Sequence, residues 1–71
     1  MTRITDIELK GLPFGSKIKV VWHNSKFHEL NAEYYGVIFE NKIGYTDGKI
    51  DDVSIIAESV YNGWCSVYLI G

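Results

Sequence analysis

The chain has 71 residues and a formal net charge of −2. This length allows a single domain, residues 1–71, with a modest core, because chains of this size bury only about 60% of their unfolded surface. One cysteine excludes an internal disulfide, and no apolar run approaches the roughly 18 residues of a membrane-spanning helix. We therefore expect a soluble cytoplasmic protein, located in the host cytoplasm if a phage encodes it.

The charges are distributed unevenly along the chain. Residues 1–28 carry five basic and two acidic side chains, a balance of +3. Residues 29–71 carry two basic and seven acidic side chains, a balance of −5. This asymmetry predicts either two surfaces of opposite sign or, if the strands interleave, an ordinary mixed surface.

The N-terminal residues carry the pattern of a short capped helix. Thr5 and Glu8 stand three residues apart, as in a capping box, which predicts a helix over Asp6–Lys10. The glycine and proline that follow end it. A strand through Ile7 and Leu9 is the alternative, since apolar side chains also alternate there.

The next element is a strand over Lys17–Trp22. Its alternation places three apolar side chains on a core-facing side, namely Ile18, Val20 and Trp22. The opposite side, which faces water or a partner, carries Lys17, Lys19 and Val21. A polar loop of about ten residues follows over 23–33, and such long loops are often functional.

Residues 34–48 read as a β-hairpin with a two-residue loop at Asn41 and Lys42. This loop pairs Glu40 with Ile43 and Ile38 with Tyr45. One face then carries Tyr34, Ile38, Glu40, Ile43 and Tyr45, and the other carries Tyr35, Val37 and Phe39. Both faces are largely apolar, so each is either covered within the chain or left for a partner; the pattern does not say which face is outside.

The segment Val53–Tyr61 shows an amphipathic helical stripe. The stripe consists of Val53, Ile56, Ala57, Val60 and Tyr61. Asp51 or Asp52 suits the N-cap, and Asn62–Gly63 suits the end of the helix. A strand is the alternative here, because several of these residues are indifferent helix formers.

A final strand over Trp64–Ile70 completes an α+β fold. We expect a small antiparallel sheet of about four strands, with one packed helix over Val53–Tyr61 and the short N-terminal helix. The alternative is a five-stranded SH3-like β-barrel, in which Val53–Tyr61 becomes a strand and a turn. The order of elements is loosely SH3-like in architecture, and this likeness implies no function.

Three groups of residues carry side chains that are used in catalysis or metal binding in other proteins. His23, His28 and Glu29 lack the spacing of a zinc site, so we expect no metal. Cys65 lies in a strand without a basic neighbour and reads as a buried structural thiol. Asp47, Asp51 and Asp52 fit turn-forming and helix-capping roles. We therefore expect no catalytic residues, no cofactor and no enzymatic activity.

The sequence predicts a non-enzymatic protein-binding module, such as a small phage or mobile-element accessory protein that inhibits a host or defence enzyme, in the manner of an anti-CRISPR protein. The aromatic share of 14% exceeds what so small a core can hide. The predicted interface, formed by an aromatic sheet face and an acidic C-terminal half, is Tyr34, Ile38, Tyr45, Tyr68, Asp47, Asp51, Asp52 and Glu58. On this hypothesis, changing Tyr34 and Tyr45 to serine abolishes partner capture and leaves the fold intact. A homodimer through one sheet face is a further expectation.

Two alternatives stay open. The first is a nucleic-acid-binding small barrel, SH3-like or OB-like, in which tyrosines or Trp64 stack on bases and Lys17, Lys19 and Lys42 meet phosphates. Nucleic acid is the less favoured partner because the chain has only seven basic residues. The second is an oligomeric binder of a small ligand or nucleotide. No membrane partner is expected.

Overall fold

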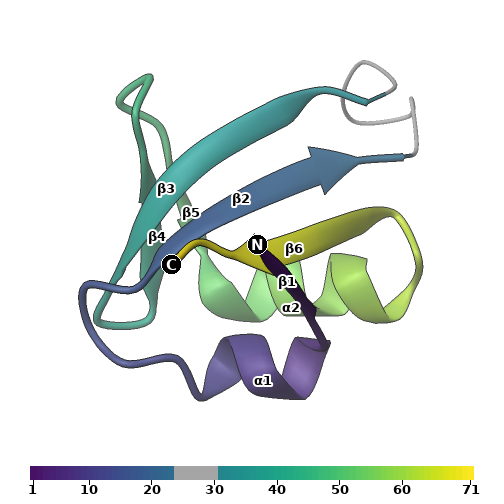
Figure 1. Ribbon diagram of the computed structural model, residues 1–71, viewed down its shortest axis with the longest axis horizontal. Helices are drawn as coiled ribbons and strands as arrows, with labels where there is room; N and C mark the ends of the chain where they lie inside the picture. The colour runs from purple at the N-terminus through teal and green to yellow at the C-terminus, as the bar shows by residue number, and fades with distance from the viewer. Residues whose placement is uncertain (24–30) are drawn as a thin grey trace.

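The computed structural model describes residues 1–23 and 31–71, which form a layer of sheet and a layer of helix (Figure 1). Six strands make up the sheet in these residues: β1 (Thr2–Ile4), β2 (Lys17–Trp22), β3 (Glu33–Phe39), β4 (Lys42–Tyr45), β5 (Ile50–Asp52) and β6 (Cys65–Leu69). Their order across the sheet is β1-β6-β2-β3-β4-β5, and every neighbouring pair is antiparallel. The predicted α+β class with an antiparallel sheet is confirmed.

The strand count differs from the prediction of about four. The two additional strands, β1 and β5, have three residues each and form the outer edges of the sheet. Three residues are too few to show an alternation in the sequence. The SH3-like barrel is not confirmed, because the pairings of the described residues leave an open sheet with β1 and β5 as its two edges.

Two helices are present at the predicted positions, α1 (Asp6–Lys10) and α2 (Val53–Tyr61). The capping box of α1 is complete: the Glu8 N–H donates to Thr5 Oγ1 at 3.1 Å, and the Thr5 N–H donates to Glu8 Oε1 at 3.0 Å. These two bonds satisfy donors that a helix start otherwise leaves unpaired. In the described residues, neither helix is long and apolar enough to cross a lipid bilayer.

The apolar stripe of α2 is confirmed in part. Val53, Ile56 and Ala57 are buried, as predicted, whereas Tyr61 is 78% exposed. Ser59 is buried instead, and its Oγ donates to the carbonyl of Ile55 at 3.1 Å. The helix ends at Tyr61, so no further turn holds this ring against the sheet.

Both helices lie on the same face of the sheet, as Figure 1 shows. The core lies between the two layers and consists of Ile4, Leu9, Ile18, Val20, Trp22, Ile38, Ile43, Val53, Ile56, Ala57, Cys65 and Val67. The alternation predicted for β2 is confirmed, since Ile18 and Val20 are buried while Lys17 is exposed. Packing against α2 and burial of Leu9 hold α1 in place, because a helix of five residues is not stable alone.

The register of the central hairpin differs from the prediction. Its loop is Glu40–Asn41, so Ile38 pairs with Ile43 and Phe39 pairs with Lys42. The predicted register would have placed Glu40 on the core-facing side opposite Ile43. The observed register instead exposes Glu40, although its φ of 53° is unfavourable for a residue with a side chain. The two registers differ by two residues, so Ile38 and Ile43 face the core in both. Keeping the Glu40 carboxylate out of the core therefore outweighs the strain in the turn.

Gly36 leaves the space that this hairpin needs on the core-facing side. A Cβ atom at Gly36 would lie 2.7 Å from Cγ2 of Ile43 and 3.1 Å from Cδ1 of Tyr45. It would also lie 3.0 Å from the carbonyl oxygen of Gly44. The branched Ile43 side chain and the backbone of β4 have little freedom to withdraw, so even a methyl group overpacks this site.

We predict that Gly36→Ala lowers the free energy of unfolding by about 1–3 kcal/mol, because the added methyl group forces Ile43 and β4 apart. Urea denaturation followed by circular dichroism measures this change. Gly11→Ala is the matched control, since a Cβ atom at Gly11 meets nothing closer than 3.7 Å. Equal stability of the two variants would contradict the close packing at Gly36.

Candidate functional site

In the described residues, no helix covers the sheet face opposite α1 and α2, which is called the open face here. Directly paired residues of antiparallel strands project to the same side of a sheet, so the register defines this face. It consists of Arg3, Lys17, Lys19, Val21, Glu33, Tyr35, Val37, Phe39, Lys42, Ile50, Asp52, Ser66 and Tyr68. Tyr35 is 44% exposed, Val37 40% and Ile50 59%, so the face presents apolar surface as well as charge.

Four residues of the open face form a straight row across four strands. Arg3 of β1 pairs with Tyr68 of β6, Tyr68 pairs with Lys19 of β2, and Lys19 pairs with Tyr35 of β3. The row therefore alternates between a cation and an aromatic ring. We call it the cross-strand row; it spans three inter-strand spacings, about 14 Å.

Lys19 is held in place at the middle of the row. Its Nζ lies 5.2 Å from the centroid of the Tyr68 ring and 3.7 Å from Oε1 of Glu33. The same Oε1 accepts a hydrogen bond from the Tyr35 hydroxyl at 3.4 Å. These contacts leave the Lys19 side chain only 16% exposed. A cation in contact with a ring and a carboxylate fixes the spacing of its neighbours as well as supplying charge.

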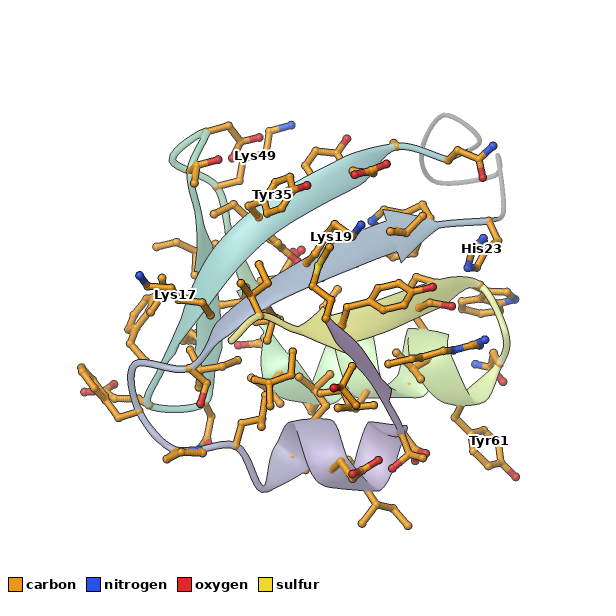
Figure 2. All side chains as sticks on the ribbon, in the orientation of Figure 1. Lys17, Lys19, His23, Tyr35, Lys49 and Tyr61 are labelled. Atoms are coloured by element: carbon orange, nitrogen blue, oxygen red, sulfur yellow. The ribbon has the colours of Figure 1, made fainter. Side chains whose placement is uncertain are left out.

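The other two cations of this region are more accessible. Arg3 and Lys17 are exposed, and neither forms an ion pair with another described residue. Figure 2 shows Lys17 at the beginning of β2, and Lys19 and Tyr35 on the neighbouring strands β2 and β3. Tyr61 lies at the end of α2, away from these residues.

Charge is divided between the open face and the rest of the molecule. The open face carries four basic and two acidic side chains, a balance of +2. The remaining described residues carry two basic and six acidic side chains, a balance of −4. This division separates the open face from the helices and turns, so it differs from the division between the two halves of the sequence.

The aromatic part of the predicted interface is split between the two faces. Tyr34, Ile38 and Tyr45 lie on the helix-covered face, where Ile38 is 2% exposed and both rings pack against the core. The centroids of the Tyr34 and Tyr45 rings are 5.9 Å apart in an edge-to-face arrangement. Tyr68 alone of the four lies on the open face. Tyr34 and Tyr45 are therefore packing residues, and a double change to serine is expected to disturb the fold.

The acidic residues of the predicted interface also differ in their surroundings. Asp47 accepts a hydrogen bond from the Lys49 N–H at 3.0 Å within a turn, as its structural interpretation predicts. Asp51 is on the helix-covered side, opposite Ile43, and Glu58 is exposed on α2. Asp52 occupies the N-cap of α2, but its carboxylate pairs with Lys42 instead of capping the helix. Asp51 and Asp47 both add to the rise that burial causes in the pKa of Tyr45 and so lie near each other, whereas Asp52 pairs with Lys42 and Glu58 lies on α2.

His23 and Ser66 form a contact that resembles a base beside a nucleophile. His23 Nε2 lies 2.8 Å from Ser66 Oγ. The Ser66 side chain is buried, with the residue only 1% exposed, so a substrate cannot reach its hydroxyl. The contact therefore ties the end of β2 to β6. His28 and Glu29, considered with His23 for metal binding, lie outside the described residues, and the described part of the chain holds no group of three metal-binding side chains.

Cys65 is buried, and burial raises the pKa of its thiol to about 12. Its Sγ lies 4.0 Å from the carbonyl oxygen of Ile56 on α2. A thiol with so high a pKa is almost entirely protonated at neutral pH and is a poor nucleophile. These properties agree with the predicted role as a structural thiol.

Sequence reasoning did not assign Arg3 and Tyr35 to the candidate surface. The hairpin pattern placed Tyr35 and Val37 on one face, but it did not show which face the helices cover. Arg3 lay in no predicted element. Only the register across β1, β6, β2 and β3 aligns these side chains in the cross-strand row.

The Tyr45 hydroxyl is buried and makes no hydrogen bond of normal geometry with the described residues. Burial raises its pKa, and the negative charge of Asp51 adds to this effect. We predict that Tyr45→Phe raises the free energy of unfolding by about 1 kcal/mol, because it removes an unsatisfied polar group and keeps the ring. Thermal unfolding of this variant beside Tyr34→Ser/Tyr45→Ser tests both expectations. A destabilised Tyr45→Phe would mean that the hydroxyl has a strong partner.

The stability of the protein should fall as the pH rises from about 9 to about 12. The folded state holds the Cys65 proton up to a pKa of about 12, whereas the unfolded thiol loses it near its ordinary value of 9.0. The folded state thus binds more protons than the unfolded state in this window. Each pH unit therefore lowers the free energy of unfolding by up to about 1.4 kcal/mol. Urea denaturation at several pH values measures how steeply the free energy of unfolding falls with pH. This dependence should be shallower for Cys65→Ala than for the wild type. Parallel slopes for the two proteins would contradict this.

No protein-family model matches the chain, and neither a curated protein nor a solved structure shows significant similarity to it.

Proposed function

We propose that this chain is a non-enzymatic binding module that holds a negatively charged partner against the open face. The observation that carries this proposal is the cross-strand row, in which Arg3 and Lys19 alternate with Tyr68 and Tyr35. Aromatic rings and arginine are the side chains that contribute most at binding surfaces. Their presence on the uncovered side of the sheet supports a role in recognition.

The sign of the charge on this face supports an anionic partner. The open face has a balance of +2 in a chain whose net charge is −2. Exposed charges separated by more than about 8–10 Å are largely screened at physiological salt. The Cα atoms extend over 29 × 25 × 21 Å, so much of the acidic surface lies beyond this distance. A partner at the open face therefore meets mainly Arg3 and Lys17, because Lys19 is largely covered and pairs with Glu33.

The original expectation of an acidic surface facing a basic protein receives less support. Asp47 and Asp52 are engaged in a turn and an ion pair, while Asp51 and Glu58 lie on different elements. A dispersed set of carboxylates does not present a continuous complementary surface. A protein remains an admissible partner, provided that it offers carboxylates or phosphates to the open face.

Charge reversal on the two sides of the molecule tests the proposal. We predict that Lys17→Glu weakens retention on an immobilised anionic polymer, heparin, and lowers the salt concentration at which the protein elutes. Lys10→Glu, on α1, is the matched control, because it changes the net charge equally on the opposite side of the sheet. Lys19→Glu is less suitable, since it would place a second carboxylate beside Glu33.

The wild-type protein should be retained at 50 mM salt, and only Lys17→Glu should elute substantially earlier. Circular dichroism of both variants confirms that the fold is unchanged. Absence of retention of the wild type, or equal elution of the two variants, would overturn the proposal that the open face binds anions.

A further inference from the structure

Resting on the proposed function, we infer that the anionic partner is single-stranded nucleic acid, with bases stacked on Tyr35 and Tyr68 and phosphates held by the exposed Arg3 and Lys17. The inference follows from the order of side chains in the cross-strand row. Cation and ring alternate along it, and single-stranded nucleic acid alternates between a charged phosphate and a planar base. The carboxylates of an acidic peptide would pair with the cations, but such a peptide has no regular series of planar groups that could stack on the two tyrosine rings.

The spacing of the two tyrosines suits bases that are stacked separately. Tyr68 and Tyr35 lie on β6 and β3, with β2 between them, so their backbones are about 10 Å apart. Lys19 lies between them, 5.2 Å from the Tyr68 ring centroid. Proteins that recognise RNA on an open sheet stack two or three bases on rings of the central strands. Here the rings belong to two strands that flank the central β2.

A single strand fits the surface better than a duplex. The major groove of B-DNA admits a helix or a two-stranded ribbon, whereas the open face belongs to a six-stranded sheet. Bases in a duplex are also stacked on one another, so they are not available to Tyr35 and Tyr68. In a single strand each base has an exposed face, and stacking on a tyrosine does not require a particular base.

The small number of cations makes the rings necessary for binding. Two phosphate contacts, to the exposed Arg3 and Lys17, give a slope of about −1.4 in a plot of log K against log salt for a single strand. Raising the salt from 50 to 200 mM should therefore weaken binding about sevenfold. Base stacking depends much less on salt, so it must supply the remaining affinity.

The apolar surface beside the row supports the same partner. A second line of paired residues runs Lys17, Val37, Gly44 and Ile50 across β2, β3, β4 and β5. Phe39 lies over Gly44, since a Cβ atom there would be 2.8 Å from Cε1 of the ring. The exposed Val37 and Ile50 side chains thus form an apolar surface next to Lys17 that sugars and base edges can contact.

The first experiment is a fluorescence-anisotropy titration with dye-labelled ten-nucleotide oligo(dT) at 50 mM salt. The comparison probes are a ten-unit abasic strand of equal charge, the corresponding duplex and a ten-residue polyglutamate peptide. We predict that oligo(dT) binds at least about fivefold more tightly than the abasic strand, because only bases stack. The duplex and the peptide should bind more weakly than oligo(dT).

Substitutions at two exposed tyrosines locate the contact. Tyr35→Ala should weaken binding of oligo(dT) at least about fivefold and leave binding of the abasic strand unchanged. Tyr35→Phe keeps the ring and loses only the hydroxyl contact with Glu33, so it should bind as the wild type does. Tyr61→Ala is the matched control, since Tyr61 is exposed on α2, away from the open face.

The outcomes separate this inference from the proposed function. Equal affinity for oligo(dT) and the abasic strand, with retention on heparin, would overturn base stacking and leave the anion-binding face in place. Tighter binding of polyglutamate would overturn the inference in favour of an acidic protein. Failure to bind any anionic probe, heparin included, would overturn both. The comparison of probes uses the wild-type protein, so it is decisive even if Tyr35→Ala does not fold.

Discussion

The pairing of Ile38 with Ile43 is the contact on which the rest of the structure depends. Both side chains are almost completely buried, and their pairing fixes the register of β3 and β4. A shift of one residue would turn every side chain of a strand to the other side of the sheet. The same register moves Glu40 into the turn and requires the absence of a side chain at Gly36.

From this register the two faces of the sheet acquire different compositions. Ile18 and Val20 of β2 turn toward α2, and Lys17 and Lys19 therefore turn away from it. The pairing of β2 with both β3 and β6 extends the arrangement across four strands, where Arg3 joins the same face. The open face is thus a direct consequence of burying the isoleucines and valines on the other side.

Much of the fold follows from local patterns in the sequence. The capping box at Thr5, the alternation over Lys17–Trp22 and the stripe over Val53–Tyr61 place their elements correctly, because each depends on neighbouring residues only. The predicted loop of the hairpin was wrong because Asn41 and Lys42 resemble a turn, whereas the observed loop moves Glu40 out of the core-facing row. The local turn preference is weaker than the cost of placing a carboxylate opposite the buried Ile43.

The candidate site was less accessible to sequence reasoning for a related reason. Alternation separates Tyr34 from Tyr35, but only the packing of the core shows that Tyr34 lies on the covered side of the sheet. The strand β1 is too short to be recognised, so the position of Arg3 beside Tyr68 could not be foreseen. A surface assembled from four strands depends on pairings between residues far apart in the chain, and no local pattern records them.

The composition of the open face is the strongest reason to regard it as functional. The two helices in residues 1–23 and 31–71 cover one side of the sheet, so the side opposite them must tolerate water. Small polar residues would be sufficient for that purpose, and exposed apolar side chains invite aggregation. The open face instead exposes Tyr35, Val37 and Ile50 next to Arg3 and Lys17. Departures of this kind from what stability requires are expected at sites that bind a partner.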